Sequence, residues 1–456
     1  MAIAKDTASF RDPSGFVYSD RGKIFRQVNL YYKSEYDKLM GSGLYDELTS
    51  EGLLVKHKEI NTEGHPGAYK VIQPEKVSFI SYPYEWCFSQ LKDAALLTLK
   101  IQKIAMKYGM GLKDASAYNI QFHTGRPVFI DTLSFEIVDK PKPWVAYRQY
   151  CQHFLAPLLL MAKRDIGLAK LLRDYIDGIP LDMASDLLKG RSRLSFGVNV
   201  HIHMHARLQK RHAGTAKKGV KEKTINQNSL IGIITSLENT TKKIKWQPDK
   251  TEWGEYYTFT NYNDKSFNQK KKIIDKFINI AKPKTVWDLG ANNGLFSRIA
   301  SDRGIRTVAF DIDPVAVEAN YLHIKEQGET KIRAILMDLT NSSPALGWAH
   351  EERQSLEQRG PTDMIFALAL VHHLAISNNL PLESVADYFC RLGEYLVIEF
   401  VPKGDSQVDK LLATREDIFP NYTEEGFEAA FKTKYSLVDK IKIRGSKRTL
   451  YLMKKK

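Results

Sequence analysis

The residues whose types and spacing point most clearly to chemistry lie between Val286 and Ser297. An apolar run ends there in Asp288-Leu289-Gly290-Ala291-Asn292-Asn293-Gly294, and an amphipathic stretch follows. This order predicts a buried strand, a glycine turn and the start of a helix. Glycines let a backbone approach a ligand closely, and the first turn of a helix has free N–H groups. The segment therefore predicts a nucleotide-type binding loop, and we expect Asn292 and Asn293 at its tip to line the pocket.

Two further carboxylates follow predicted strands. Asp311 ends the apolar run 307–311, and Asp338 follows a third predicted strand at 331–337. In a nucleotide-binding βαβ unit, an acid at the end of the second strand, about twenty residues after the glycine loop, accepts hydrogen bonds from ribose hydroxyls. Asp311 has this spacing, and we predict that it binds a ribose.

The elements that must position these residues alternate between strands and helices. The sequence predicts strands at 363–370 and 395–400, helices at 314–327 and 381–392, and an antiparallel pair at 436–443 and 448–453. This alternation is typical of an α/β fold with a doubly wound, Rossmann-like sheet, which binds its ligand at the carboxyl ends of the strands. We therefore predict such a domain at about 250–456, closed by a terminal antiparallel hairpin.

These residues resemble the class I S-adenosylmethionine (SAM) methyltransferases. Asp288, Gly290 and Gly294 match the glycine-loop motif of that family. The resemblance implies that SAM is the cofactor, that Asp311 holds its ribose and that Asp338 contacts its adenine. A dehydrogenase-like domain, or a fold that has lost its ligand, is the alternative interpretation.

A histidine pair follows the fourth predicted strand, where methyltransferases of this class place residues that face the substrate. Histidine is the usual proton acceptor near neutral pH, so His372 or His373 is a candidate catalytic base. The alternative is a histidine that caps the loop or contacts the methionine end of SAM. The strand lacks the Asn-Pro-Pro-Tyr motif of many nitrogen-directed methyltransferases, which favours an oxygen acceptor.

A second group of candidate residues lies in the N-terminal domain, 1–205. Asp114, Asn119 and, after an apolar run, Asp131 resemble the catalytic and metal-binding loops of kinase-like phosphotransferases. That resemblance implies an α+β, kinase-like domain in which Asp114 orients an acceptor hydroxyl while Asn119 and Asp131 hold magnesium. The sequence departs from the pattern, because no histidine precedes Asp114, no Phe-Gly follows Asp131 and no glycine-rich loop is present. An Asp-containing turn whose side chains cap backbone groups is the alternative.

The kinase resemblance also predicts the elements around this loop. They are a hairpin at 16–28, helices at 31–48 and 86–108, and a strand at 77–82. Arg26 occupies the position where a kinase has lysine, and Lys23 is the alternative for that position.

The net charge of +14 in 456 residues is concentrated between 206 and 284. We predict a basic linker at 206–249, between the two domains. Such a patch suits nucleic acid, anionic lipid or an acidic substrate. The alternative is a solvated linker followed by a helix with 270–272, three lysines, on its outer face. No recognised nucleic-acid module accompanies the charge, which disfavours a nucleic-acid partner.

Cysteine content and apolar runs exclude several classes of protein. Three widely spaced cysteines give neither a disulfide framework nor a zinc pattern. The start lacks the apolar core of a signal peptide, and no apolar run approaches the roughly 20 residues of a membrane span. We therefore expect a cytoplasmic protein without a membrane span. His201, His203 and His205 would share one face of a strand, which suits a metal, but no carboxylate or cysteine completes a ligand set, so no metal is predicted.

Over nearly its full length the chain resembles a bacterial family of fused methyltransferases that includes the nodulation protein NoeA. The resemblance is carried by the segments 81–86, 112–119, 144–149, 286–297 and 372–374. It implies methyl transfer to an acceptor that the sequence does not name, such as a small molecule, a glycan or a carrier-linked group. A bifunctional kinase–methyltransferase and a binding protein with a vestigial methyltransferase fold are the alternatives. We expect the acceptor in a cleft between the two domains, with the aromatic-rich segment 246–262 as a lid.

Overall fold

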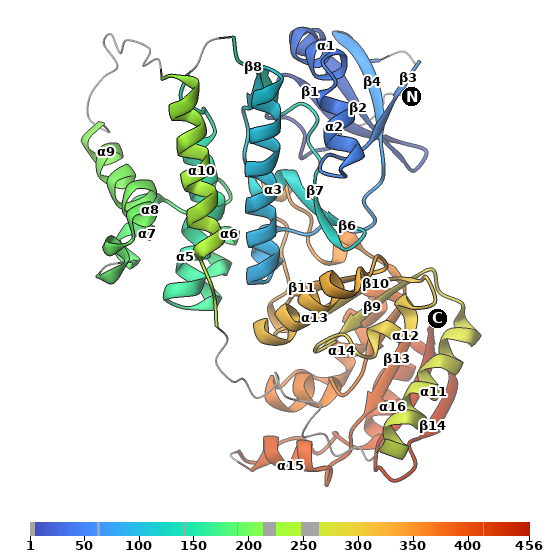
Figure 1. Ribbon diagram of the computed structural model, residues 1–456. Helices are drawn as coiled ribbons and strands as arrows, with labels where there is room; N and C mark the ends of the chain where they lie inside the picture. Colours follow the sequence, from blue (N-terminus) through green and yellow to red (C-terminus); the bar gives the residue numbers. More distant parts are fainter. Residues whose placement is uncertain are drawn as a thin grey trace. The chain divides into compact units, whose positions relative to one another are not determined.

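The computed structural model describes residues 5–61, 64–139, 142–188, 190–212, 225–247, 264–413 and 415–456. The chain divides into two compact units (Figure 1). The first contains Met1–Gln247 and Leu346–Arg353, and the second contains Pro248–Ala345 and Gln354–Lys456. Residues 248–262 of the predicted lid lie outside the described residues.

A seven-stranded sheet forms the centre of the second unit. Its strands are β9 (Thr285–Leu289), β10 (Arg306–Asp311), β11 (Ile332–Leu336), β12 (Thr362–Ala367), β13 (Gly393–Phe400), β14 (Tyr435–Lys442) and β15 (Thr449–Lys455), in the order β11-β10-β9-β12-β13-β15-β14. The first five are parallel, and β15 runs antiparallel to both β13 and β14. The chain begins at the centre of the sheet, adds strands on one side and then returns to the other, as in a doubly wound fold. The predicted α/β sheet with a terminal antiparallel hairpin is confirmed.

The helices of the second unit are α11 (Asp264–Ala281), α12 (Ser297–Ser301), α13 (Pro314–Gln327), α14 (Leu382–Leu392), α15 (Ser406–Leu412) and α16 (Glu424–Lys432). Local sequence explains the bounds of α13, which match the prediction. Asp313 caps its start by accepting a hydrogen bond from Val315 N at 2.8 Å, and Pro314 is its first residue. Gly328 ends it in the left-handed conformation, with φ at 64°.

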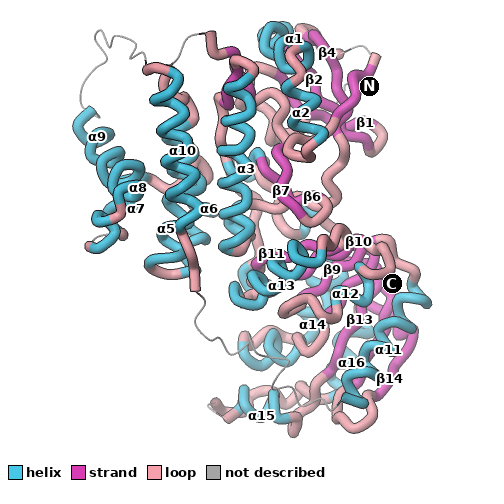
Figure 2. Tube along the Cα trace, viewed as in Figure 1, coloured by secondary structure: helices cyan, strands magenta, loops and turns pink. Residues whose placement is uncertain are grey.

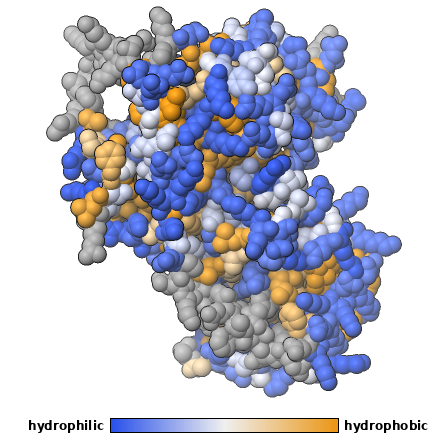
Figure 3. All heavy atoms as spheres, in the orientation of Figure 1, coloured by the Kyte–Doolittle hydropathy of each residue, from blue (hydrophilic) through white to orange (hydrophobic). Residues whose placement is uncertain are grey.

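The core of the second unit lies where α11 packs on the sheet. Apolar residues of the central strands and of α11 form one buried cluster that includes Ile274, Phe277, Val286, Phe366 and Val397. Burying such side chains stabilises a fold by about 1.5–3 kcal/mol each. On the face of the molecule shown in Figure 3, hydrophilic residues cover most of each unit and hydrophobic residues gather in smaller patches.

The first unit combines an antiparallel sheet with a helical part (Figure 2). The sheet has the order β1-β2-β4-β3, with β1 (Gly15–Asp20), β2 (Lys23–Asn29), β3 (His57–Ile60) and β4 (Ala68–Pro74), and α1 (Lys33–Gly41) and α2 (Leu44–Ser50) lie between β2 and β3 in the chain. The long helix α3 (Phe88–Lys107) follows, and then the short strands β5 (Met110–Leu112), β6 (Ile120–His123), β7 (Arg126–Phe129) and β8 (Phe135–Ile137). The predicted hairpin at 16–28 and helix at 86–108 are confirmed. The kinase-like interpretation of this unit stays a prediction.

The remaining helices of the first unit are α4 (Tyr147–Tyr150), α5 (Ala156–Lys163), α6 (Leu171–Asp174), α7 (Leu181–Leu187), α8 (Phe196–Val198), α9 (His205–His212) and α10 (Gln227–Lys243). Two of them, α9 and α10, fall within the segment predicted as a linker. Helix α10 packs on α3 and buries Leu230, Ile234 and Leu237. A large part of the basic segment is therefore an ordered helix of this unit.

Two predicted elements of the first unit differ in the structure. The helix predicted at 31–48 is interrupted at Gly43, whose φ of 89° is incompatible with a continuous helix. The segment 77–82 is not a strand. The backbone N–H and C=O of Ser81 bond to the side-chain amide of Gln121, both at 2.9 Å, and not to the backbone of a neighbouring strand.

The three alternating histidines are helical, so the prediction that they share one face of a strand is wrong. His201 and His203 lie in a π-helical turn, Asn199–Met204, that leads into α9. The ring nitrogens of His201 bond to the hydroxyls of Tyr147 and Ser236 at 2.7 and 2.9 Å. Within the described part of the chain, no group of three His, Cys, Asp or Glu side chains could hold a metal ion. None of the described helices is long and apolar enough to span a membrane.

Candidate functional site

A pocket of about 240 Å³ lies at the carboxyl ends of β9, β10, β11 and β12 in the second unit. Its lining includes most of the predicted SAM-site residues, namely Asp288, Gly290, Asn292, Asp311, Asp338 and His373. Strands β9 and β12 are neighbours at the point where the chain reverses the direction in which it adds strands. Open α/β sheets bind ligands at this switch point. The sheet therefore brings residues from four separate loops around one cavity.

The glycine loop after β9 is tied to the end of β10. Gly290 N and Ala291 N both donate to Phe310 O at 2.9 Å, and Gly290 has φ at 78°, which favours glycine. A Cβ at Gly294 would lie 2.6 Å from Asn320 Oδ1, so this glycine permits close packing of the loop on α13. Gly290 therefore forms part of the pocket wall. Gly294 does not line the pocket, and it lets the loop pack closely on α13.

The two asparagines at the tip of the loop differ, contrary to the prediction that both line the pocket. Asn292 lines it, with φ at 51°, whereas Asn293 is not among the lining residues. Both backbone polar groups of Asn293 are hydrogen-bonded within the protein. Its N–H donates to Asn292 Oδ1 at 2.8 Å, and its carbonyl accepts from Arg298 Nη1 at 2.8 Å.

Asp288 is a buried carboxylate with one oxygen free of protein partners. Its residue is 1% exposed, and its Oδ2 accepts a hydrogen bond from Ser297 Oγ at 2.6 Å. Its Oδ1 is buried and has no hydrogen-bond partner. Burial raises the pKa of Asp288 to about 7, although Ser297 and the Lys270 ammonium oppose the rise. Buried polar atoms are rarely left unpaired without a ligand or water to satisfy them.

Asp338 binds a backbone N–H group of its own loop, and Asp311 binds one of its own loop and one of the glycine loop. Asp311 Oδ2 accepts from Asn292 N at 2.6 Å, and its Oδ1 accepts from Asp313 N at 2.9 Å. Burial raises the pKa of Asp311 to about 6 against these hydrogen bonds. Asp338 Oδ1 accepts from Thr340 N at 2.9 Å. Each carboxylate is thus fixed in orientation at the pocket wall.

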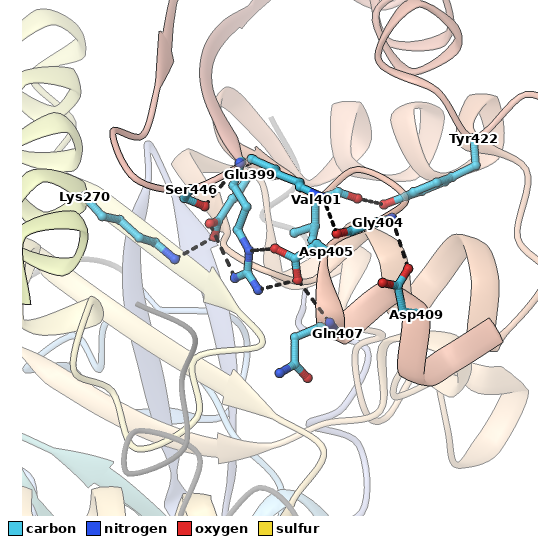
Figure 4. A network of polar contacts seen from close by, with 11 residues as sticks. Lys270, Glu399, Val401, Gly404, Asp405, Gln407, Asp409, Tyr422 and Ser446 are labelled. Atoms are coloured by element: carbon cyan, nitrogen blue, oxygen red, sulfur yellow. Dashed lines mark hydrogen bonds and ion pairs between the residues drawn. The ribbon is translucent and has the colours of Figure 1, made fainter. Parts of the chain in front are cut away.

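A buried network of four charged side chains adjoins the pocket (Figure 4). Lys270 Nζ donates to Glu399 Oε2 at 2.6 Å, and these side chains are 2% and 0% exposed. Arg448 lies 3.8 Å from the other oxygen of Glu399, and its Nε donates to Asp405 Oδ2 at 2.8 Å. Lys270 also lines the pocket, with Nζ 4.4 Å from the centre of the Phe296 ring.

The position of Lys270 corrects the prediction that it lies on the outer face of its helix. Phe267, Lys270, Ile274 and Phe277 follow the i, i+3, i+7, i+10 spacing of a single helix face. That face packs on the sheet, so the lysine is carried into the interior with its apolar neighbours. This spacing is the sequence signal that identifies Lys270 as a buried residue.

The two histidines after β12 have different surroundings. His373 lines the pocket, while His372 is 1% exposed and is not among the lining residues. Their rings are 4.1 Å apart. Burial, together with the charge of Arg448, lowers the pKa of His373 to about 4. Burial and the neighbouring His373 lower the pKa of His372 well below its usual value. Both imidazoles are therefore neutral at pH 7, and His373 is the one placed to meet a ligand.

Several lining residues carry no sequence motif and were not predicted. Leu368, Ala369 and Leu370 directly follow β12, and Ser377 and Asn378 lie beyond the histidines. Ala369 has φ at 50°, a left-handed conformation that costs a non-glycine residue about 1–3 kcal/mol and that is found mainly at functional sites. Only the folded backbone reveals these positions.

The second predicted group, in the first unit, also comes together. Asp114 lies close enough to Asp131 and Asn119 for each to affect its pKa, which burial raises. Arg26 Nη1 lies 2.5 Å from Asp131 Oδ1. Burial raises the pKa of Asp131, but Arg26 and the hydrogen bond from Ser134 outweigh it, so this pKa lies below its usual value.

One oxygen of each carboxylate in this group already has a protein partner, and the predicted magnesium site stays a prediction. Asp131 Oδ1 is paired with Arg26 and also accepts from Leu133 N at 2.9 Å. Asp114 Oδ1 accepts from Ser116 N at 2.8 Å, which is the capping arrangement predicted as the alternative. Magnesium is usually held in octahedral geometry by one or two carboxylates together with waters and phosphates, so an ion at Asp131 Oδ1 or Asp114 Oδ1 would compete with Arg26 or with the Ser116 N–H.

The nodulation protein NoeA of Rhizobium meliloti (strain 1021) is 34% identical to this chain over 452 residues, which cover 97% of this chain and 94% of NoeA. No protein-family model matches the chain.

Three solved structures are similar to part of the chain. The N-methyltransferase NodS from Bradyrhizobium japonicum WM9 is 11% identical, with a TM-score of 0.32, over 42% of this chain and 98% of NodS. The magnesium protoporphyrin IX methyltransferase ChlM from Synechocystis PCC 6803, with bound SAH, is 16% identical, with a TM-score of 0.33, over 45% and 92%. The bifunctional kinase-methyltransferase WbdD is 17% identical, with a TM-score of 0.28, over 41% and 39%.

Proposed function

The chain belongs to the family of the nodulation protein NoeA, and within that family we propose that its second unit is a SAM-dependent methyltransferase. One observation carries the proposal. Three carboxylates, Asp288, Asp311 and Asp338, line one pocket after the adjacent strands β9, β10 and β11. Along the sheet edge their order is Asp338, Asp311 and Asp288. This order matches that of the base, the ribose and the amino acid in SAM, which is a nucleoside with an attached amino acid.

The polar groups of the pocket suit this cofactor. We assign Asp338 to the adenine, Asp311 to the ribose hydroxyls and Asp288 to the ammonium of the methionine part. The free Oδ1 of Asp288 supports the last assignment, because a buried carboxylate oxygen without a donor costs about 1–3 kcal/mol or more. An ammonium from a ligand would supply that donor as a charge-assisted hydrogen bond.

Bound SAM supplies an electrophilic methyl group. The protein must align the acceptor atom, exclude water and receive a proton where the acceptor is a hydroxyl. His373 is the candidate for the last role, because it lines the pocket and its imidazole is unprotonated at neutral pH; its lowered pKa, about 4, makes it a weaker base than an ordinary histidine. The β12 end reads Phe366-Ala367-Leu368-Ala369-Leu370 and lacks Asn-Pro-Pro-Tyr. We therefore propose an oxygen acceptor in a small molecule, a glycan or a carrier-linked group.

The proposal is tested by calorimetry with SAM and S-adenosylhomocysteine on the full chain. We expect both to bind, and we expect Asp311→Ala to weaken binding by about 1–3 kcal/mol, because it removes hydrogen bonds from the ribose hydroxyls to a charged acceptor. Asp363→Ala is the matched control, since Asp363 accepts from Lys284 N, at 2.7 Å, and is not among the lining residues. Failure of both compounds to bind a folded sample would reject the proposal.

The same samples separate binding from catalysis. Labelled-methyl transfer from SAM into small-molecule, glycan, protein and RNA fractions identifies the acceptor class. In that assay we expect His373→Ala to bind SAM but transfer little methyl.

For the first unit we propose acceptor recognition without phosphotransfer. We expect no magnesium-dependent ATP binding, because Arg26 already neutralises Asp131 and backbone groups engage Asp114. Calorimetry with ATP, with and without Mg²⁺, measures this. Arg26→Lys is the variant to compare in the same ATP titrations, because it restores the residue type found at this position in the kinase-like pattern. Magnesium-dependent ATP binding that Asp131→Ala abolishes would instead establish the bifunctional kinase–methyltransferase alternative.

A further inference from the structure

A second cavity, of about 1230 Å³, lies in the first unit along helix α10, which Figure 1 shows between α3 and the helices α7 to α9. One face of α10 forms a wall of this cavity. The residues of this face recur at intervals of three and four positions, namely Asn228, Ile231, Gly232, Thr235, Ser236, Asn239, Thr240 and Lys243. Roughly 22 Å of helix separates the first of them from the last, so the cavity is a long groove, which we call the α10 groove.

The other walls of the α10 groove are formed by the segment 188–198 and by the carboxyl end of α5. Phe196 in that segment is 78% exposed, so its ring presents an apolar surface. The lining side chains that carry a hydroxyl or an amide are Ser192, Ser195, Asn228, Thr235, Ser236, Asn239 and Thr240. The charged ones are Lys163, Arg164 and Lys243, and no aspartate or glutamate is among the described lining residues. The groove is therefore polar, with an excess of positive charge.

The carboxyl ends of α5 and α10 lie at the same end of the groove. The helical run that ends as α5 begins at Tyr147 and passes beside α10. Near its start, Tyr147 OH bonds to His201 Nδ1 at 2.7 Å, and His201 Nε2 bonds to Ser236 Oγ at 2.9 Å. About one turn later, Tyr150 OH bonds to Thr241 Oγ1 at 2.9 Å. The two helices thus advance in the same direction.

The three cations are therefore gathered at that end of the groove. Lys163 and Lys243 are the last residues of α5 and α10, and Arg164 directly follows Lys163. Along the rest of α10, the described lining residues are uncharged, and most of them carry a hydroxyl or an amide. The groove thus matches a ligand that has an anionic group at one end and hydroxyl groups along its length.

We propose that the α10 groove binds an oligosaccharide with a phosphate group at one end. The phosphate meets Lys163, Arg164 and Lys243 in charge-assisted hydrogen bonds, and the sugar hydroxyls bond to the polar side chains of α10. The inference rests on the acceptor recognition proposed for the first unit, and it names the class of ligand and the site. A single-stranded nucleic acid fits less well, because its phosphates follow the whole strand and need cations along the whole groove.

Gly232 supports this assignment independently of the charges. It lies in the interior of α10, where glycine is less favourable than alanine. A Cβ at this position would have no atom within 4 Å, so the packing of the described residues does not require a glycine here. The missing side chain instead keeps the wall of the groove open near the middle of α10, where the sugar rings would lie.

Two hydroxyls of the same wall are already oriented by the protein. Ser236 Oγ is held by His201 Nε2, and Thr240 Oγ1 donates to Ser236 O at 2.7 Å. A hydroxyl has one donor and two acceptor positions, so each can still bond to a ligand. Hydroxyls that are fixed in this way lose less freedom when a ligand binds.

The test compares sugars that differ in the phosphate alone. Calorimetry on the full chain measures the affinities of maltotetraose 1-phosphate and cellotetraose 1-phosphate, each against the same sugar without phosphate. We expect the wild-type protein to prefer at least one phosphate ester by about 10- to 100-fold. Lys243→Gln should reduce this preference by about three- to tenfold. Lys242→Gln is the matched control and should keep it, since Lys242 pairs with Glu238 at 2.6 Å and is not among the lining residues.

Gly232→Leu fills the groove without a penalty in folding. The position has open space around it, and leucine has a higher helix propensity than glycine, so the Tm should not fall. Binding of the preferred phosphate ester should nevertheless weaken by at least about tenfold, because the side chain occupies the path of the sugar. Gly232→Ala should be as stable as Gly232→Leu and should keep most of the affinity.

Binding of SAM to the same samples separates this inference from the proposed function. If SAM binds but the phosphate esters bind no better than the neutral sugars, or not at all, the inference is wrong and the methyltransferase proposal stands. If the esters bind as expected but SAM and S-adenosylhomocysteine do not, the groove is a saccharide site and the proposed function fails. Unchanged affinity in both Lys243→Gln and Gly232→Leu would also refute the inference. Tighter binding of single-stranded oligo(dT) than of either ester, weakened by Gly232→Leu, would assign the groove to nucleic acid instead.

Discussion

Replacing Glu399 by alanine is expected to lower the free energy of unfolding of the second unit by about 3–5 kcal/mol. The side chain is 0% exposed and lies between Lys270, at 2.6 Å, and Arg448, at 3.8 Å. Its removal takes from the buried Lys270 the carboxylate that pairs with it, while Arg448 keeps Asp405. Breaking a buried ion pair by removing one partner has an effect of this size. Urea unfolding of the full chain measures the change, and hydrogen exchange of β13 and β15 assigns it to the second unit.

Glu428→Ala is the matched control. Glu428 pairs with Lys440 at 2.6 Å and with Lys432 at 3.2 Å, so its contacts resemble those of Glu399, but both lysines are more than a third exposed. Solvent screens such pairs, and their removal costs at most about 1 kcal/mol. Equal effects of the two substitutions on the free energy of unfolding would show that burial does not determine how much the Lys270–Glu399 pair contributes to stability.

The sheet and the glycine loop could be predicted because their signals are local. The apolar runs of β9 and β10, the glycine at 290 and the cap residue Asp313 each determine the structure of a few neighbouring residues. The carboxylates at 288, 311 and 338 then meet because carboxyl ends of parallel strands share one edge of a sheet. No knowledge of distant contacts is needed for either step.

The unpredicted features depend on contacts between distant segments. Segment 77–82 is apolar enough for a strand, but Gln121, about forty residues later, takes the backbone hydrogen bonds of Ser81. Lys270 becomes a pocket residue because Glu399, 129 residues away, pairs with it. A lysine triplet alone indicates an exposed helix face, and only the apolar spacing around position 270 contradicts that interpretation.

The affinity for SAM or S-adenosylhomocysteine is expected to fall steeply as the pH is lowered from 8 to 5. Asp288 must be ionised to pair with the ligand ammonium, and burial places its pKa at about 7 in the free protein. Below that pH the carboxyl group is protonated, and binding must first release the proton. Each pH unit below the pKa then weakens binding about tenfold, which amounts to about a hundredfold at pH 5.

Asp311 makes the dependence steeper below its own pKa of about 6. It contributes up to about a further tenfold at pH 5, because a protonated carboxyl group accepts hydrogen bonds from the ribose less well. His373 does not titrate in this range, since its pKa is lowered to about 4. Calorimetry at pH values from 8 to 5 measures how the affinity for SAM or S-adenosylhomocysteine depends on pH.

Substitutions show which carboxylate causes each part of the pH dependence of affinity. Asp288→Asn should bind more weakly at pH 8 but lose the step near pH 7, because an amide carries no proton to release. Asp311→Asn should keep that step and lose the steeper part below pH 6. A profile that is flat from 8 to 5 in the wild type would mean that neither carboxylate meets the ligand in its charged form. If Asp288→Asn has the same pH profile as the wild type, Asp288 does not bind the ligand ammonium, and that assignment is wrong.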